Sequence, residues 1–179
     1  MSDEIKRTGR KLIYKGAILS VYKDYIEFPN GGTAEWDFIQ HDGAAAVVPV
    51  MEDGRILMVQ QYRNALDRKT LEIPAGKLDT SDESGLECSR RELEEETGYR
   101  SEKLEWLLTL RTTVAFCNEK IEIYVAKDLI PASQKLDEGE YVEVKAYTID
   151  ELKEMIFTGR IEDSKPVAAL LAYESKYLK

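Results

Sequence analysis

The chain has 179 residues, which is enough for one domain with a substantial hydrophobic core. Its formal net charge of −9 argues against a nucleic-acid partner, because binding a phosphate backbone requires clustered Lys and Arg. The N-terminus has no apolar segment typical of a secretory signal, and no apolar run approaches the length that spans a bilayer. Two cysteines and one histidine disfavour disulfide frameworks, cysteine zinc sites and His-based triads. We therefore expect a cytoplasmic protein without a membrane partner.

The first predicted elements form a hairpin. Residues 18–28 and 33–40 have strand-like sequences, and the Asn-Gly-Gly sequence at residues 30–32 is typical of a hairpin turn. On this basis we divide the chain into an N-terminal β-hairpin extension, residues 1–42, and a main domain, residues 43–179.

Strand patterns continue through the main domain. A continuous apolar run indicates a buried strand, and alternating apolar positions indicate others. The predicted strands are residues 44–51, 55–63, 104–113, 120–127 and 141–147.

Capping signals predict three helices. Ser84 and Glu87 form a capping box, and Gly98 suits a left-handed cap at the other end of the same helix. A second capping box at residues 148–151 opens a helix of two to three turns, and a third helix begins at about Asp163. Central strands with helices interleaved and at the end predict an α+β fold, an α/β/α sandwich around a mixed sheet.

Three glutamates on the first helix have the spacing of a cation site. Glu92, Glu95 and Glu96 stand at i, i+3 and i+4, so they share one helix face, where like charges repel each other. Carboxylate oxygens are the ligands that Mg²⁺ prefers, which would explain why a sequence retains this repulsion. The alternative interpretation is a solvated acidic helix face.

The surrounding residues resemble the Nudix family, whose signature is G-x5-E-x7-R-E-U-x-E-E-x-G-U with U an apolar residue. Residues 91–99, RELEEETGY, follow Glu83 after seven residues and match this half of the signature. Six residues rather than five separate Gly76 from Glu83, and Asp82 lies at the five-residue spacing. Either Asp82 or Glu83 can therefore be the first acidic residue of the box.

The resemblance implies a metal-dependent hydrolase. It implies that Glu92 and Glu96 are the principal ligands of Mg²⁺, for which Mn²⁺ can substitute, in a site of two or three ions. Glu95 is implied as an additional ligand. The backbone carbonyl of Ala75 resembles a further ligand of the family.

The resemblance also implies the catalytic residues. Glu95 belongs to them, and Arg91 holds the loop to the helix by pairing with the first acidic residue. An acidic loop before the last strand supplies the general base, and both Glu138 and Glu140 are candidates; its alternative interpretation is a solvated loop. The structural positions of the box are Gly76, Glu83 and Gly98.

Sequences outside the box resemble the ADP-ribose pyrophosphatase branch of the family. Residues 72–76, EIPAG, are similar to its E-x-P-A-G segment, and Arg63 resembles an arginine that contacts the substrate phosphates. Glu119 matches a substrate-side glutamate, and Trp36 lies on a hairpin that often contacts the base and a partner subunit. The resemblance thus implies a homodimer. The alternatives are a surface position for Arg63 and, for Trp36, burial in a dimer interface or core.

We therefore expect Mg²⁺-dependent hydrolysis of a nucleoside diphosphate sugar, with ADP-ribose giving AMP and ribose 5-phosphate. One departure concerns residues 113–116, where Val114 replaces a proline common among ADP-ribose hydrolases. UDP-sugars, GDP-sugars or dinucleotides are therefore alternative substrates. A more distant alternative is a non-catalytic ADP-ribose sensor.

Overall fold

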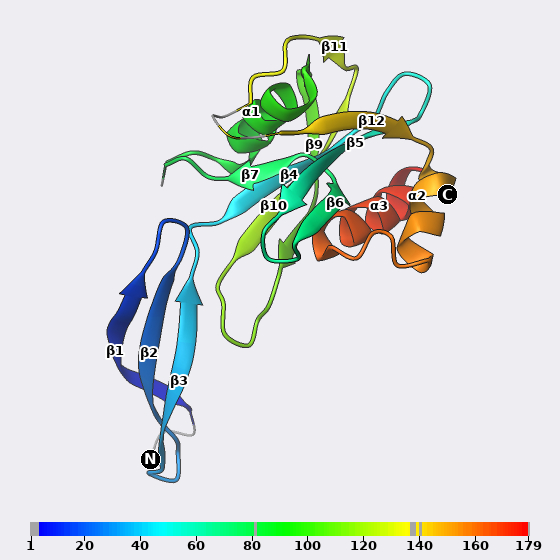
Figure 1. Cartoon of the computed structure of the whole chain (residues 1–179). Coiled ribbons are helices and arrows are strands. Elements are labelled where there is room, and N and C mark those ends of the chain that lie inside the picture. Colours follow the sequence, from blue (N-terminus) through cyan, green and yellow to red (C-terminus); the bar gives the residue numbers. More distant parts are fainter. Residues whose placement is uncertain (1–3, 81, 137–138, 140, 179) are drawn as a thin grey trace. The chain divides into compact units, whose positions relative to one another are not determined.

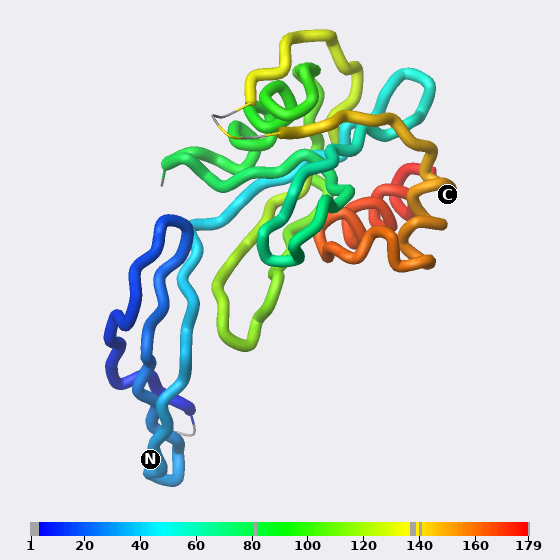
Figure 2. The backbone as a smooth tube through the Cα atoms, viewed as in Figure 1, coloured from blue at the N-terminus to red at the C-terminus, as the bar shows by residue number. Residues whose placement is uncertain are grey.

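The computed structural model describes residues 4–80, 82–136, 139 and 141–178. The chain forms two compact units. The N-terminal unit comprises Met1–Gly43 together with Arg111–Lys120, and the C-terminal unit comprises Ala44–Leu110 with Ile121–Lys179. Each unit is coloured by chain position in Figure 1, and the tube in Figure 2 traces its backbone.

The N-terminal unit is built on an antiparallel sheet with the strand order β1-β2-β3. The strands are β1 (Lys6–Lys15), β2 (Ser20–Glu27) and β3 (Thr33–Gln40). The two predicted strands and their turn are confirmed, and Gly31 supplies the positive φ of 81° that the turn requires. Strand β1 was not predicted, because almost all of its residues are exposed and its sequence has no regular alternation of apolar and polar residues. It is held instead by pairing with β2.

A mixed sheet forms the centre of the C-terminal unit, with the strand order β7-β4-β10-β9. Its members are β4 (Ala44–Pro49), β7 (Ala75–Lys77), β9 (Lys103–Arg111) and β10 (Lys120–Lys127). Strand β4 pairs in parallel with β10 and antiparallel with β7. Strands buried on both faces of a sheet have nearly continuous apolar sequences, which explains the runs in β4 and β10. The predicted mixed sheet is confirmed.

A second, antiparallel sheet has the order β12-β5-β6. It comprises β5 (Ile56–Arg63), β6 (Arg68–Glu72) and β12 (Glu143–Tyr147). The short strands β8 (Tyr99–Arg100) and β11 (Ile130–Pro131) pair with each other. Strand β6 was not predicted, because its first residues are charged.

Helices cover both faces of the mixed sheet (Figure 1). Helix α1 (Gly85–Thr97) buries Leu93 against Val47 of β4. The next residue of β4, Val48, belongs to a separate hydrophobic cluster, which includes residues of α2 (Ile149–Phe157) and α3 (Ser164–Tyr177). Because successive residues of a strand point to opposite faces, α1 lies on one face and the other two helices on the other. This is the predicted α/β/α sandwich.

The helix ends agree with the sequence signals. Ser84 and Thr148 are N-caps within complete capping boxes, and Asp163 is the N-cap of α3. Gly98 has the left-handed φ of 71°, and its N–H donates to the carbonyl of Glu94. None of the helices in the described residues combines the length and apolar content needed to cross a bilayer.

Candidate active site

The three glutamates of α1 differ in burial. Glu92 and Glu96 are 9% and 2% exposed, whereas the Glu95 side chain is 38% exposed. Arg91 lies between them and the preceding loop: its Nη1 donates to Glu92 at 2.6 Å and to Glu95 at 3.1 Å. Burying acidic groups is costly unless they are paired, so this guanidinium stabilises the arrangement.

Arg91 also fastens the loop before α1 to the helix. Its Nε donates to Glu83 at 3.0 Å, and its Nη2 donates to the carbonyl of Lys77 at 3.0 Å and to Glu83 at 3.3 Å. Glu83 in turn accepts the Asp79 N–H at 2.8 Å. Glu83, one of the two acidic residues that the sequence left open, thus accepts hydrogen bonds from Arg91. The loop between Gly76 and Glu83 accommodates its extra residue without losing this pairing.

Both members of this pair are stabilised in their charged forms. Hydrogen bonding from Arg91 holds the pKa of Glu83 below its usual value. Burial lowers the pKa of Arg91, but the hydrogen bonds that Arg91 donates to Glu83 and the charge of Glu92 outweigh it and raise that pKa. Both side chains are therefore charged near neutral pH.

Strand β7 forms the wall against which the buried glutamates lie. The Ala75 N–H donates to Glu96 Oε2 at 3.0 Å, and Gln61 Nε2 of β5 contacts Glu96 Oε1 at 3.4 Å. A Cβ added to Gly76 would lie 1.8 Å from Glu92 Oε1. Only glycine lets the strand approach this carboxylate so closely. We call Glu83, Arg91, Glu92, Glu95 and Glu96 the box cluster.

A second arginine, Arg63 at the end of β5, pairs with Glu72 of β6. Its Nε and Nη2 donate to the two carboxylate oxygens at 2.6 and 2.7 Å. The hydrogen bond with Glu72 raises the pKa of Arg63; burial opposes this, and the charges of Glu72 and Glu96 add to it. Arg63 therefore lies close enough to the box cluster to feel the charge of Glu96, while its side chain remains 39% exposed.

The acidic loop lies mostly outside the described residues, which include neither Glu138 nor Glu140. The segment before it is attached to the end of α1. The N–H of Lys135 donates to the carbonyl of Glu95 at 3.0 Å, and Gln134 Nε2 donates to the carbonyl of Glu96 at 2.7 Å. These contacts satisfy carbonyls that a helix end leaves unpaired. The sequence reasoning missed both residues, since only tertiary structure brings them to α1.

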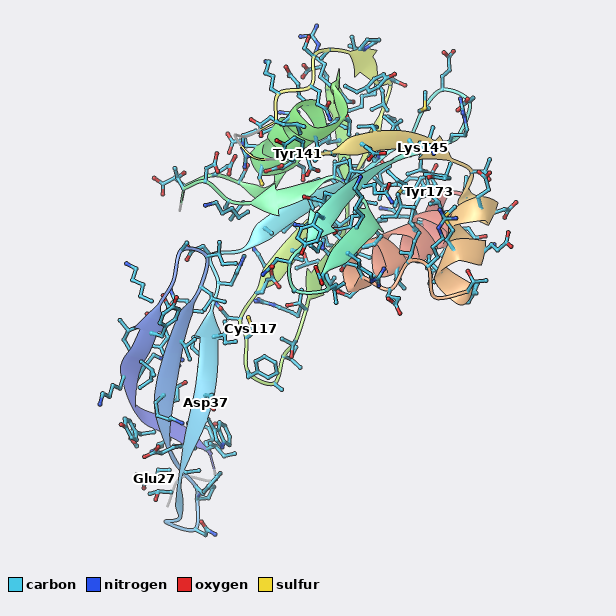
Figure 3. All side chains as sticks on the ribbon, viewed as in Figure 1. Glu27, Asp37, Cys117, Tyr141, Lys145 and Tyr173 are labelled. Atoms are coloured by element: carbon cyan, nitrogen blue, oxygen red, sulfur yellow. The ribbon has the colours of Figure 1, made fainter. Side chains whose placement is uncertain are left out.

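After the acidic loop the chain continues into β12 through Tyr141, which is exposed and labelled in Figure 3 with Lys145 of β12. Residue Glu143 begins β12 and pairs with Gln60 of β5. The described segments on both sides of the loop are thus fixed to the C-terminal unit.

Trp36 and Glu119 belong to the N-terminal unit. Trp36 is 48% exposed on β3, so it does not lie in the core of this unit, and burial in a dimer interface stays an alternative. Glu119 accepts a hydrogen bond from Thr112 Oγ1 at 2.6 Å and lies 3.7 Å from Nε2 of His41. Val114 is strongly exposed in the turn that departs from the family pattern.

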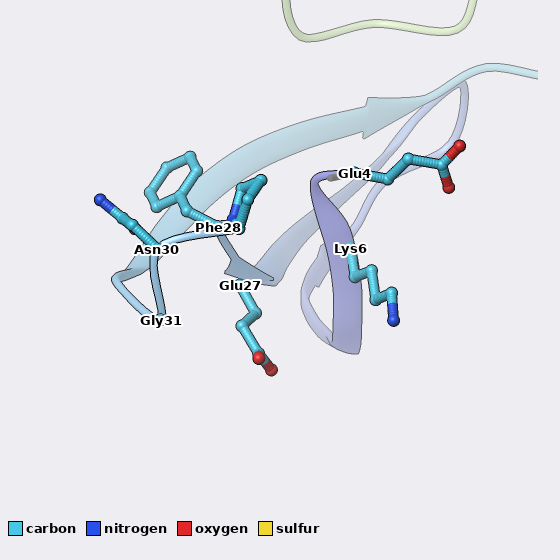
Figure 4. A pocket seen from close by; sticks show the side chains of 7 residues that line it. Glu4, Lys6, Glu27, Phe28, Asn30 and Gly31 are labelled. Atoms are coloured by element: carbon cyan, nitrogen blue, oxygen red, sulfur yellow. The ribbon is translucent and has the colours of Figure 1, made fainter. Parts of the chain in front are cut away.

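Trp36 also lines an open hollow of about 600 Å³. Its lining is largely apolar with two acidic residues: Val21, Glu35, Trp36, Asp37, Ile39, Ala115 and Phe116. A smaller hollow of about 260 Å³, shown in Figure 4, lies at the turn between β2 and β3 and is lined by Glu4, Lys6 and residues 27–31. None of the predicted site residues lines the smaller hollow.

Comparison with known families gives a direct match. The NUDIX domain model matches residues 40–170, which is most of the chain. The chain belongs to the Nudix family. It is a Nudix hydrolase, and its fold is the one that the sequence resemblance implied.

Relatives cover nearly the whole of this Nudix chain. It is 40% identical over 169 residues to the methanol dehydrogenase activator of Bacillus methanolicus, covering 93% of this chain and 91% of that one. It is 35% identical over 180 residues to the ADP-ribose pyrophosphatase of Bacillus subtilis, covering 99% and 94%. A crystal structure of an ADP compounds hydrolase superposes with a TM-score of 0.85 at 22% identity, covering 96% and 93%, and shows the same fold.

Nudix hydrolases generally use divalent metal ions, and the side chains of the box cluster are suited to hold one. Its donors are carboxylate oxygens, the ligand type that hard divalent cations prefer. Two of its carboxylates are buried, and the cluster holds more carboxylates than its one guanidinium can neutralise. In this conformation no three Asp, Glu, His or Cys side chains of the described residues are close enough together to ligate one ion. The donor chemistry fits, and Glu92 and Glu95 would have to exchange contacts with Arg91 for the ion in order to hold it.

Proposed function

We propose that the chain hydrolyses the pyrophosphate bond of a nucleoside diphosphate sugar, with ADP-ribose giving AMP and ribose 5-phosphate. The observation that carries this proposal is the buried glutamate pair of the box cluster within a matching Nudix domain. Two relatives named ADP-ribose pyrophosphatase support the substrate: that of B. subtilis, and that of Mycobacterium tuberculosis at 32% identity over 94% of this chain.

In this proposal, Glu92 and Glu96 are the principal ligands of Mg²⁺, with Glu95 and the carbonyl of Ala75 as further ligands and Mn²⁺ as a substitute. A divalent cation held there offsets the charge of the diphosphate and makes a bound water more acidic. The chain keeps these ligands in place through the contact of Ala75 with Glu96 and the close approach of Gly76 to Glu92.

Other residues then act on the substrate directly. Arg63 binds the diphosphate, since a guanidinium offers parallel donors to phosphate oxygens. One of Glu138 or Glu140 accepts the proton of the attacking water. Trp36 stacks on the base, and Glu119, which accepts a hydrogen bond from Thr112, also contacts the substrate.

We also propose that the chain works as a homodimer. The N-terminal unit exposes several large apolar side chains that are close together in the sequence, and clustered exposed apolar side chains are typical of interaction sites. These side chains are Leu12, Ile13, Tyr14 and Ile18. Light scattering should give the mass of a dimer at micromolar concentration, and a monomer mass would overturn this part of the proposal.

A second function is suggested by the relative from B. methanolicus, whose identity to this chain is higher than that of the pyrophosphatases. The chain would then also activate a methanol dehydrogenase. Adding the protein to such a dehydrogenase should raise its turnover, and an unchanged rate would reject this function without affecting the first.

The main experiment measures phosphate release, coupled to alkaline phosphatase, across ADP-ribose, UDP-glucose, GDP-mannose, dinucleotides and nucleoside triphosphates, with and without Mg²⁺. We expect a dominant, Mg²⁺-dependent signal with ADP-ribose. A preference for another nucleotide sugar would overturn the substrate and point to the turn that carries Val114. No hydrolysis of any compound would favour a non-catalytic ADP-ribose sensor.

A further inference from the structure

Glu72 is a buried carboxylate that meets two cations from distant parts of the chain. It is 1% exposed. Arg63 of β5 donates hydrogen bonds to both of its carboxylate oxygens, and Nζ of Lys165 of α3 lies 3.3 Å from Oε2. Thr70 Oγ1 donates to Oε1 at 2.6 Å. Glu72 is therefore shared between two cations, and one of them, Lys165, comes from a helix far away in the sequence.

Lys165 is itself fixed at the beginning of α3. Its backbone N–H donates to Asp163 Oδ1 at 3.1 Å, the N-cap interaction of the helix, and its Nζ forms an ion pair with the same carboxylate. Its side chain is only 18% exposed. The result is a row of alternating charges in the order Asp163, Lys165, Glu72 and Arg63, which we call the Glu72 cluster. Figure 1 shows the start of α3 beside β6.

The far end of this row is the arginine assigned to the diphosphate. Nε and Nη2 of Arg63 are committed to Glu72, whereas Nη1 has no hydrogen bond to any residue that the structure describes. An arginine anchored along one edge keeps its planar fork in a fixed orientation and can donate from the remaining nitrogen. The strength of the Arg63–Glu72 ion pair depends on whether Lys165 also neutralises part of the Glu72 charge.

We propose that Lys165 is a positioning residue for Arg63 and acts through Glu72. This inference rests on the proposed role of Arg63 in binding the diphosphate. Lys165 takes part of the negative charge of Glu72 and fixes its carboxylate plane. The charge of Arg63 is therefore less fully neutralised by Glu72, and Arg63 attracts phosphate oxygens more strongly. Without Lys165, Glu72 becomes the counter-ion of Arg63 alone and competes more strongly with the substrate.

The first test compares Lys165→Met with Lys165→Arg and with the control Lys153→Met. Lys153 of α2 forms ion pairs with Glu174 and Asp150, so the control also removes a partly buried, paired lysine. The readouts are kcat, KM and the Kd of α,β-methylene ADP-ribose, an analogue whose diphosphate bridge is not cleaved. If Lys165→Met does not fold, Lys165→Gln replaces it.

We expect Lys165→Met to raise the Kd of the analogue and the KM by about five- to tenfold, the size of coupling typical of residues that share one ionic network. Lys165→Arg should restore both to within about twofold of the wild type, and Lys153→Met should leave them unchanged. A wild-type Kd in Lys165→Met, measured on folded protein, would overturn the inference.

The second test is a double-mutant cycle with Arg63→Gln, which separates positioning from a structural role. If Lys165 acts through Arg63, then Lys165→Met should change the Kd no further once Arg63 is removed. Independent effects that multiply in the double variant would overturn the inference. A wild-type protein that hydrolyses no nucleoside diphosphate sugar would instead reject the proposed function. If it prefers another nucleotide sugar, the methylene analogue of that sugar is used.

Discussion

Two charged clusters of the C-terminal unit differ in their balance of charge. In the box cluster, four carboxylates accompany a single guanidinium. In the Glu72 cluster, two carboxylates are matched by two cations. A buried excess of one sign is costly, and among the described residues the box cluster has more carboxylates than cations, whereas the charges of the Glu72 cluster are matched. This difference is what we expect if the box cluster binds a cation and the Glu72 cluster orients the substrate, as proposed above.

The largest expected effect is the loss of activity in Glu96→Gln. The amide keeps the shape of the side chain and can still accept the Ala75 N–H, but it loses the charge that binds a cation. We expect kcat/KM to fall by on the order of 10²–10³-fold, as for other groups that stabilise charge in an active site. The fold should survive, as circular dichroism would show.

The matched control for this variant is Glu94→Gln on the same helix. Glu94 pairs with Lys135 at 3.0 Å outside the box cluster. Its activity should stay near that of the wild type. Near-normal activity in Glu96→Gln would remove the box cluster from the mechanism.

Gly76→Ala tests the wall behind the buried glutamates. Its Cβ would overlap the carboxylate of Glu92, and the backbone there is held by pairing with Ala45 of β4. Overpacking of this kind costs about 1–3 kcal/mol. Thermal unfolding should therefore shift down by several degrees, at about 2–4 °C per kcal/mol, and activity should fall as Glu92 is displaced.

Gly9→Ala provides the control, because a Cβ there would meet only Tyr25, at an ordinary contact distance of 3.5 Å. It should leave the melting temperature nearly unchanged. If both variants melt together with the wild type, Glu92 moves freely and the close approach of β7 is not required.

The pH dependence of stability tests the Glu72 cluster. Burial alone would raise the pKa of Glu72, but the hydrogen bond from Arg63 and the charge of Lys165 lower it from 4.5 to about 2. Because this pKa is depressed in the folded state, the stabilisation is complete above about pH 4.5 and is lost as the pH falls toward 2.

In Glu72→Gln this contribution should be absent. Denaturant unfolding at neutral pH should show a loss of about 1–3 kcal/mol, the cost of leaving buried partners unsatisfied. The difference from the wild type should shrink as the pH is lowered below about 4.5. A difference that stays constant or grows toward acidic pH would show that Glu72 contributes no ion-pair stabilisation.

The smallest expected effect comes from an exposed ion pair, Lys69 with Glu143. Its contribution to the free energy of unfolding is the reference for the contributions of the buried ion pairs. Both side chains are more than half exposed. Lys69→Met should change the free energy of unfolding by less than about 1 kcal/mol, because surface pairs are screened by solvent. A loss as large as that of Glu72→Gln would mean that burial does not distinguish these clusters.

Local sequence signals predicted much of the fold and of the box cluster. The capping boxes fixed the starts of α1 and α2, and the i, i+3, i+4 spacing placed Glu92, Glu95 and Glu96 on one helix face. These features depend on residues within one or two turns of each other, so they can be read along the chain. Family resemblance then connected them to a reaction.

Contacts between distant segments could not be predicted in this way. Lys165 and Glu72 meet only because α3 packs beside β6. Gln134 contacts α1 only because the segment that follows β11 returns to the end of that helix. The steric need for glycine at position 76 appears only once β7 lies against Glu92. The general base stays a prediction, with Glu138 and Glu140 both open.

The most direct test of the difference between the two clusters is a titration of Mn²⁺ by calorimetry into the wild type, Glu96→Gln and Glu72→Gln. Each of the two variants lacks one buried carboxylate of the C-terminal unit. The wild type and Glu72→Gln should bind the ion with similar affinity, and Glu96→Gln at least about tenfold more weakly. Equal affinity in all three proteins, or a greater loss in Glu72→Gln, would contradict the assignment of cation binding to the box cluster.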